Sequence, residues 1–365
     1  MTGKTSLIAM IQSTLTRLPK FASLFLFAIL CTCQTPPPAP PVVVQPKAPP
    51  PPAVPDHSAE IAARNAAFQD LVSMQERLYR VAAPLLLNNI ELCPTQSKYL
   101  LGFTAKNKYS YTSEFTDSAA AVLGLGDQLQ IMSVTPGSGA ASVGLKNGDK
   151  LVAIGDVQLP QGPSAEMQAR GVLISLLSEK TAINVTVHRD GANIMLKVPL
   201  TRTCAFSMEL GNTGVANAYA DGQRVMLTRG MMQALPSDED LAIVIAGEMG
   251  YNVAKRTAKL RNTSAPSDII DNLERVHPDL DKLPQTKPLG EDFDMMADRR
   301  AMFMLARANY PAEEYARFWT RIAQQGGPLD AYVSQHPVTA RRSAAMGRAL
   351  ADIKKQQAQH KPLQP

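Results

Sequence analysis

The chain contains only four cysteines among 365 residues, and only 5% of its residues are aromatic. So few cysteines exclude a small domain held together by many disulfides. The composition also excludes a polytopic membrane protein, and the apolar segment at residues 21–30 is too short to cross a bilayer as a helix. There is no basic stripe with interleaved aromatic residues, so nucleic acid is not an expected partner.

Hydrophobic residues make up 45% of the chain and charged residues 19%, which is enough apolar material for about two domains. The charge is unevenly distributed, because residues 1–55 contain four basic residues and no acidic residue. Removal of residues 1–32 lowers the formal charge from +5 to +2. The rest of the chain therefore lacks the positive charge that nucleic-acid binding needs.

The N-terminus has the pattern of a secretory signal, in which a positive segment precedes an apolar core of ten residues. The core ends in Leu30-Cys31-Thr32-Cys33, which resembles the lipobox of bacterial lipoproteins, although Thr32 replaces the usual Gly or Ala. This resemblance implies removal of residues 1–32, a lipid on Cys33 and a location in the cell envelope, facing the periplasm. Gln34 after the cysteine favours the outer membrane. An ordinary signal peptide and an uncleaved anchor are the alternatives.

Proline dominates the next segment, since 11 of the 28 prolines lie within residues 36–55. Proline fixes φ and has no backbone N–H to donate, so we predict an extended linker over residues 33–56. We interpret it as the tether of a lipid-anchored protein, and a proline-rich ligand motif is the alternative.

Residues 101–200 alternate glycine-rich turns with short runs typical of strands, predicted at 130–134, 150–154, 182–188 and 193–198, and they contain one predicted helix at 164–178. Thr135-Pro-Gly-Ser-Gly-Ala-Ala141 and Gly144-Leu-Lys-Asn-Gly-Asp149 resemble the pattern of a bacterial PDZ domain. The resemblance implies a groove between a strand and a helix, where an extended peptide adds as a further strand. Gly124, Leu125 and Gly126 are the residues predicted to receive a terminal carboxylate, with a role in turns alone as the alternative.

Helices are predicted on both sides of this block. The first runs from His57 to Ala83, and Pro84 is expected to stop or kink it. The others are predicted at residues 241–252, 294–308, 311–325 and 337–356. Three segments resemble elements of the HtpX/Oma-like zinc metallopeptidases (peptidase family M-48): Asn217-Ala-Tyr-Ala-Asp-Gly222, Met296-Ala-Asp-Arg299 and Ser334-Gln-His-Pro-Val-Thr-Ala-Arg-Arg342. The resemblance implies an α+β protein, with a PDZ-like β-rich domain inserted into a mainly helical, gluzincin-type metallopeptidase-like domain. We expect the N-terminal helix of that domain within 57–100, the PDZ-like domain at 101–200, the remainder at 201–358 and a tail at 359–365.

The zinc-binding motif of that family is absent from the chain. His-Glu-x-x-His places two imidazoles on one helix face, whereas the corresponding segment here is Gly247-Glu248-Met249-Gly250-Tyr251. Glycine offers no ligand, a tyrosine phenol has a pKa near 10, and Met296 occupies the position of the family's third ligand, a glutamate. We therefore expect no metal ligand at Gly247, Tyr251 or Met296. Glu248 keeps the position of the general base, which is vestigial without zinc, and Asp298 and His336 are the other candidate catalytic residues.

Two further questions about this segment have alternative answers. Glycine in a helix interior costs roughly 1 kcal/mol relative to alanine, so Gly247 and Gly250 indicate either tight packing under a neighbouring element or an opened cleft. A different metal site is conceivable from His336 with the nearby carboxylates, which are Glu248, Glu291 and Asp294. A His336 satisfied by hydrogen bonds within the protein is the interpretation we favour.

In the lipoprotein interpretation Cys31 leaves with the signal and Cys33 carries the lipid, so two cysteines remain. We predict a disulfide between these two, Cys93 and Cys204, because the envelope is oxidising and a PDZ fold brings its chain ends together. Two buried, unpaired cysteines are the alternative.

Three functions follow from these observations. The first, which we favour because all three ligand positions differ, is a non-catalytic envelope lipoprotein that binds peptides or proteins through its PDZ-like groove and needs no cofactor. The second is an active zinc metalloendopeptidase in envelope quality control, so enzyme activity is left open. The third is a structural envelope protein.

Overall fold

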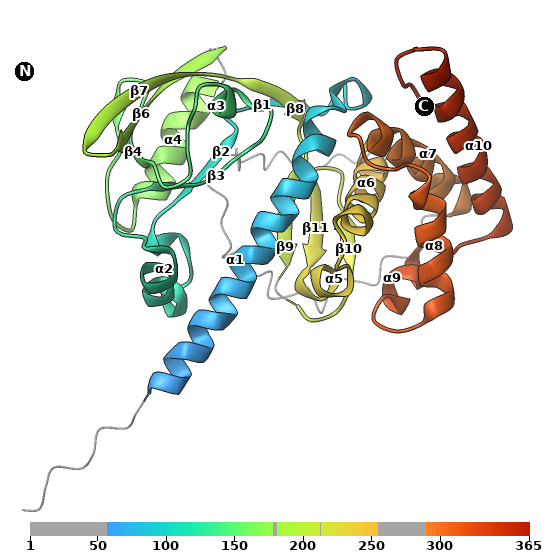
Figure 1. Cartoon of the computed structure of the whole chain (residues 1–365), viewed down its shortest axis with the longest axis horizontal. Coiled ribbons are helices and arrows are strands. Elements are labelled where there is room, and N and C mark those ends of the chain that lie inside the picture. Colours follow the sequence, from blue (N-terminus) through green and yellow to red (C-terminus); the bar gives the residue numbers. More distant parts are fainter. Residues whose placement is uncertain (1–56, 178–180, 212, 255–289) are drawn as a thin grey trace, which may run out of the picture. The chain divides into compact units, whose positions relative to one another are not determined.

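The computed structural model describes residues 57–177, 181–211, 213–254 and 290–365 and contains both helices and sheets, as predicted (Figure 1). The predicted signal, Cys33 and the proline-rich linker lie outside these residues. Residues 56–365 belong to one compact unit. No helix in the described part of the chain is both long and apolar enough to span a bilayer.

The described helices and strands follow each other along the chain in this order: α1 (Ser58–Leu87), β1 (Ser97–Leu100), β2 (Phe103–Lys106), α2 (Thr116–Leu123), β3 (Gln130–Val134), α3 (Gly139–Ser142), β4 (Lys150–Ile154), β5 (Val157–Gln158), α4 (Ala165–Leu177), β6 (Ala182–Arg189), β7 (Ala192–Pro199), β8 (Thr201–Cys204), β9 (Ser207–Gly211), β10 (Ala218–Ala220), β11 (Arg224–Thr228), α5 (Arg229–Ala234), α6 (Asp238–Ala254), α7 (Glu291–Arg307), α8 (Glu314–Gln325), α9 (Asp330–Gln335) and α10 (Ala340–Ala358). Short 3₁₀ helices lie at Ile90–Leu92, Lys108–Ser110 and Ser113–Phe115.

A six-stranded antiparallel sheet forms the PDZ-like block, in the order β2-β3-β4-β6-β7 with β5 beside β4. The four predicted strands are confirmed as β3, β4, β6 and β7, and the predicted helix is confirmed as α4. Asp190 and Gly191, both with positive φ, form the hairpin turn between β6 and β7. Apolar side chains of α4 pack on one face of this sheet and complete its core.

Strands β1 and β8 pair antiparallel where the chain enters and leaves this block, with Ser97 opposite Cys204. Beside this ladder, Cys93 and Cys204 form a disulfide with their Cα atoms 5.6 Å apart, which confirms the predicted pair. The two ends of the block, 111 residues apart in sequence, are thus held together by a ladder and a covalent bond.

The remaining elements build a second core from β9, β10, β11 and the helices α5–α10. Strand β11 lies between β10, antiparallel to it, and β9, parallel to it. Helix α6 begins after Ser237, whose hydroxyl accepts from the Asp240 amide at 3.0 Å, as a capping residue does. Helices α6 and α7 pack along each other, and α10 packs against α7 (Figure 1).

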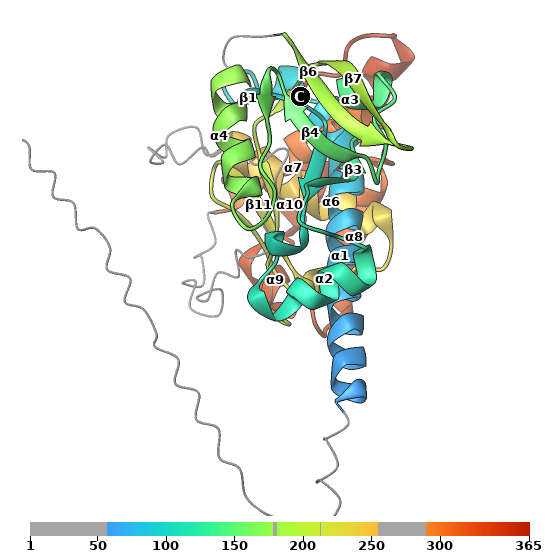
Figure 2. The same cartoon turned by 90° about the vertical axis from the view of Figure 1, so that its left-hand side faces the viewer.

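Helix α1 contacts both parts, packing against α2 and β8 and also against α6 and β9 (Figures 1 and 2). Of the stop or kink predicted at Pro84, the stop is wrong, because the helix continues to Leu87. Pro84 lies in the last turn, where a missing N–H costs one hydrogen bond, and its own carbonyl still accepts from the Asn88 amide at 3.0 Å.

Candidate functional site

The residues that the metallopeptidase resemblance singles out as candidates, Glu248, Asp298 and His336, lie in a buried polar cluster on the packed helices. Glu248 of α6 is 2% exposed, and its Oε1 accepts from the Tyr332 hydroxyl of α9 at 3.0 Å. Burial raises the pKa of Tyr332 well above its usual range, and the Glu248 carboxylate raises it further. Tyr332 therefore stays protonated at neutral pH and donates a hydrogen bond to the Glu248 carboxylate.

Tyr251 lies at the centre of a second set of contacts in this cluster. Its hydroxyl donates to Asp294 Oδ1 at 2.6 Å and is hydrogen-bonded to His336 Nδ1 at 2.9 Å. Burial raises the pKa of Tyr251 well above its usual range. Burial also acts to raise the pKa of Asp294, but hydrogen bonds from His336 and Tyr251 and the charge of Arg342 outweigh this and lower it. His336 is thus satisfied by protein groups, as we favoured.

Asp298 of α7 is fully engaged by Arg342 of α10. The guanidinium donates through Nε and Nη2 to the two carboxylate oxygens at 2.7 and 2.8 Å, and Tyr315 donates to the same carboxylate at 2.9 Å. Arg342 also donates to the carbonyl of His336 at 2.7 Å and stacks on Trp319, 4.3 Å from the ring centroid. Although burial opposes it, the Asp298 charge raises the pKa of Arg342. Asp298 therefore holds α10 and the turn at His336 in place.

The three positions that the resemblance assigns to zinc ligands do not fit a zinc ion. Gly247 has no side chain, the Tyr251 phenol is held protonated between Asp294 and His336, and Met296 is 46% exposed. Zinc sites in proteins use thiolates, imidazoles and carboxylates. In the part of the chain that the structure describes, no three His, Cys, Asp or Glu side chains form a group that could hold a metal ion. Glu291, from the alternative set, instead hydrogen-bonds Thr339 and Arg341.

The two helix glycines have different surroundings. A Cβ atom at Gly250 would lie 2.5 Å from the backbone oxygen of Ala297 on α7, so the close approach of these helices requires glycine. A Cβ atom at Gly247 would meet only the Tyr315 hydroxyl, at 3.6 Å, which is an ordinary contact. The expectation of tight packing therefore holds for Gly250 alone.

We expect opposite effects from alanine at these two positions. Gly250→Ala should lower the free energy of unfolding by about 1–3 kcal/mol, because the new methyl group overlaps backbone that cannot move aside. Gly247→Ala, the matched control on the same helix, should raise it by about 0.5–1 kcal/mol through helix propensity. Urea denaturation of both variants measures this, and equal effects would contradict the described packing of α6 on α7.

The predicted carboxylate-binding residues are corrected by the structure. Gly124, with φ 64°, ends helix α2, and its amide donates to Ala120 while that of Leu125 donates to Ala119. The Leu125 side chain packs with Phe68 of α1. Two of the three amides of Gly124, Leu125 and Gly126 thus cap a helix and are not available to a peptide carboxylate.

Strand β2 provides the edge that a peptide strand needs. It is the last strand of its sheet, and no other described strand pairs with its second edge. The Gly102 carbonyl accepts from Thr135 at 2.8 Å, so the backbone groups of the next residue, Phe103, point away from β3. The backbone groups of Ala105 also point away from β3. Its partner Ile131 uses its amide and its carbonyl for hydrogen bonds to Asp149 and Gly148, which directly precede β4.

Helix α4 lies beside this strand. Ala165, Ala169 and Leu173 of α4 share a core with Phe103 and Ala105 of β2. The side-chain amide of Asn107, which follows β2, donates to the carbonyl of Gly162, which precedes α4, at 2.9 Å. Phe103 and Ala105 are 1% and 0% exposed, so both residues are buried in this structure.

Strand β2 was not predicted from the sequence. The available signal was Leu101-Gly102-Phe103, a glycine between two apolar residues directly before a short apolar-polar alternation. The four-residue strand is too short to stand out by periodicity, and the glycines at 124 and 126 drew the prediction instead.

No model of a known protein family matches the chain, and no curated protein matches it. Among solved structures, part of the chain is similar to the crystal structure of the HtrA3 PDZ domain bound to a phage-derived ligand (FGRWV), at 16% identity and a TM-score of 0.21. The match covers 29% of this chain and 88% of that domain.

Proposed function

We propose that this protein is a non-catalytic binding protein that takes up an extended peptide, or an extended segment of a protein, along the unpaired edge of β2 once that buried edge opens. The observation that carries the proposal is the outward-facing backbone of Phe103 and Ala105 on the last strand of the sheet. An unpaired strand edge binds a peptide through main-chain hydrogen bonds, while pockets beside it select side chains. Helix α4, packed beside β2, forms the second wall of the groove.

Binding to a library of ten-residue peptides, half with free and half with amidated C-termini, tests this function on the full-length chain. Ala105→Pro removes an amide that faces the free edge and leaves the β3 ladder intact, so it should abolish binding. Met195→Lys, on the exposed strand β7 at the opposite edge, is the control and should bind as the unchanged protein does. Thermal unfolding establishes that both variants are folded. Equal binding by Ala105→Pro, or no binding by the unchanged protein, would overturn the proposal.

We further propose that the second part, at residues 201–358, is a gluzincin-type, metallopeptidase-like domain without zinc chemistry. The buried contacts of Tyr251 and the absent side chain at Gly247 support this. Purified protein should therefore contain far less than one zinc per chain and should not cleave unfolded casein. Metal analysis and a casein assay measure this, and stoichiometric zinc whose removal abolishes cleavage would establish the alternative, an active metalloendopeptidase.

For its location we propose a lipid anchor on Cys33 in the bacterial envelope, facing the periplasm. The proposal rests on the positive N-terminus, the ten-residue apolar core and the cysteine that follows it. Cys33→Ser should remove acylation and move the protein from the membrane fraction to the soluble fraction, with Cys31→Ser as the matched control. Unchanged acyl labelling of Cys33→Ser would contradict this part of the proposal.

A further inference from the structure

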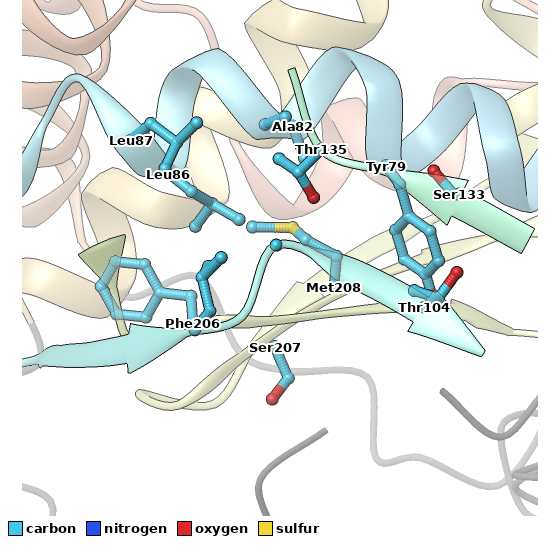
Figure 3. A pocket seen from close by; sticks show the side chains of 13 residues that line it. Tyr79, Ala82, Leu86, Leu87, Thr104, Ser133, Thr135, Phe206, Ser207 and Met208 are labelled. Atoms are coloured by element: carbon cyan, nitrogen blue, oxygen red, sulfur yellow. The ribbon is translucent and has the colours of Figure 1, made fainter. Parts of the chain in front are cut away.

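A small cavity lies on the face of β2 and β3 that is turned away from α4. It has a volume of about 100 Å³ and is bounded on one side by Thr104 of β2 and Ser133 of β3, with Gly102 just before β2 and Thr135 just after β3. Helix α1 and strand β9 form the other walls with mainly apolar side chains, which include Tyr79, Leu86, Phe206 and Met208 (Figure 3). The cavity is thus built jointly by the PDZ-like sheet and by elements outside it.

A bulge in β3 explains which side chains reach this cavity. The register with β2 shifts between Thr104 and Ala105, so Thr104 is opposite Ser133 while Ala105 is opposite Ile131. Ile131 and Ala105 therefore face the core under α4, whereas Ser133 and Thr104 face α1. Tyr79 and Thr104 lie at one end of the cavity and Phe206 and Leu86 at the other, with Met208 between them (Figure 3).

From these positions we infer that the cavity is a specificity pocket for one apolar side chain of the bound peptide, an inference that rests on the proposed function. Residues opposite each other on paired strands project to the same face, and successive residues project to opposite faces. A peptide on the edge of β2 therefore directs the side chains opposite Phe103 and Ala105 toward α4. The residue opposite Thr104 directs its side chain toward α1, into the cavity.

The size and lining of the cavity define the class of side chain. An apolar cavity of about 150 Å³ takes up benzene, so this smaller cavity suits a branched aliphatic group such as that of leucine, isoleucine or valine. No described residue in its lining is charged, and the hydroxyls of Thr104, Ser133 and Thr135 lie on the sheet side. A charged side chain would lose its hydration there without a partner of opposite charge, so the pocket should reject it. Met208 is flexible and can adapt to the shape of the group that enters.

The test compares the strongest peptide from the library with variants of that peptide in which each position is changed in turn to alanine. One apolar position should lower affinity by about tenfold or more when changed to alanine. The ratio to compare is the affinity for the original peptide divided by that for its alanine variant at this position. Ser133→Leu fills the pocket from β3 and should bring this ratio close to one. Thr104→Leu, which fills the pocket from β2, should do the same. Thr186→Leu on β6 is the matched control, because Thr186 lies between two core residues, Val185 and Val187, and away from the cavity.

The outcomes separate the pocket from the groove. A ratio that stays at tenfold in a folded Ser133→Leu or Thr104→Leu protein, or aspartate accepted as well as leucine at that position, overturns the pocket while leaving peptide binding in place. If the affinity ratio also falls close to one in Thr186→Leu, the pocket is overturned as well, because the fall in the ratio then does not depend on filling the cavity. Absence of binding to every peptide overturns the proposed function and the pocket together.

Discussion

Loss of the Cys93–Cys204 disulfide is expected to lower the free energy of unfolding by about 4–5 kcal/mol, the largest effect among our predictions. The bond closes a loop with a sequence separation of 111 residues, and cross-linking so long a loop removes much of the conformational freedom of the unfolded chain. Both cysteines are buried, 1% and 0% exposed, so serine at either position would also bury a hydroxyl. Urea denaturation of Cys93→Ser/Cys204→Ser measures the change.

Two controls accompany this prediction. Cys31→Ser/Cys33→Ser changes only cysteines outside the described residues and should leave the unfolding midpoint in place. Alkylation of the denatured, unreduced protein should modify neither Cys93 nor Cys204. Two alkylated cysteines at these positions, or a double variant as stable as the unchanged protein, would contradict the disulfide.

Replacing Arg342 by leucine is expected to lower the free energy of unfolding by about 3–5 kcal/mol, because it leaves the buried Asp298 carboxylate without its partner. The two side chains are 0% and 1% exposed, and water cannot replace the lost contacts. Arg342 also donates to the carbonyls of His336 and Pro337, so the turn between α9 and α10 loses its donors as well. Denaturant unfolding of Arg342→Leu provides the measurement.

The neighbouring arginine is the matched control for this prediction. Arg341 is 60% exposed and pairs with Glu291 and Asp292 at the surface, so Arg341→Leu should cost less than about 1 kcal/mol. Adding Asp298→Leu to Arg342→Leu should restore part of the loss, because no unpaired charge then remains buried. Similar losses for Arg341→Leu and Arg342→Leu would contradict the buried ion pair.

Elements with a clear local pattern were predictable from the sequence. Strands β3, β4, β6 and β7 have alternating apolar residues bounded by turn residues, and the Asp190-Gly191 turn between β6 and β7 has the sequence its backbone needs. Helix α6 has a capping serine followed by three acidic residues, which also marks its start without tertiary information.

Features that depend on distant contacts were not predictable in this way. Strands β1 and β8 are four residues each and exist because they pair with each other across about 100 residues of chain. Pro84 was expected to stop or kink α1, but the helix continues to Leu87 and packs against β8 and β9, and such tertiary packing stabilises helices beyond their local propensity.

The residues of the candidate site were predictable from the sequence, but their hydrogen-bond partners were not. Asp298, His336 and Glu248 were named from the resemblance, yet nothing local indicates that Arg342, Tyr251 and Tyr332 would satisfy them. Hydrogen-bond partners between helices depend on how the helices pack, and a sequence pattern does not encode that packing. The unpaired edge of β2 was missed for the same reason, because it is a property of the sheet order.

Amide hydrogen exchange with and without a saturating peptide tests most directly whether a peptide pairs with β2. We expect the amides of Phe103 and Ala105 to exchange at least about tenfold more slowly in the complex, because they gain hydrogen bonds to the peptide. Amides of β7, at the other edge of the same sheet, should exchange at unchanged rates. Slower exchange in β7 with no change at Phe103 and Ala105 would show that the peptide does not pair with β2.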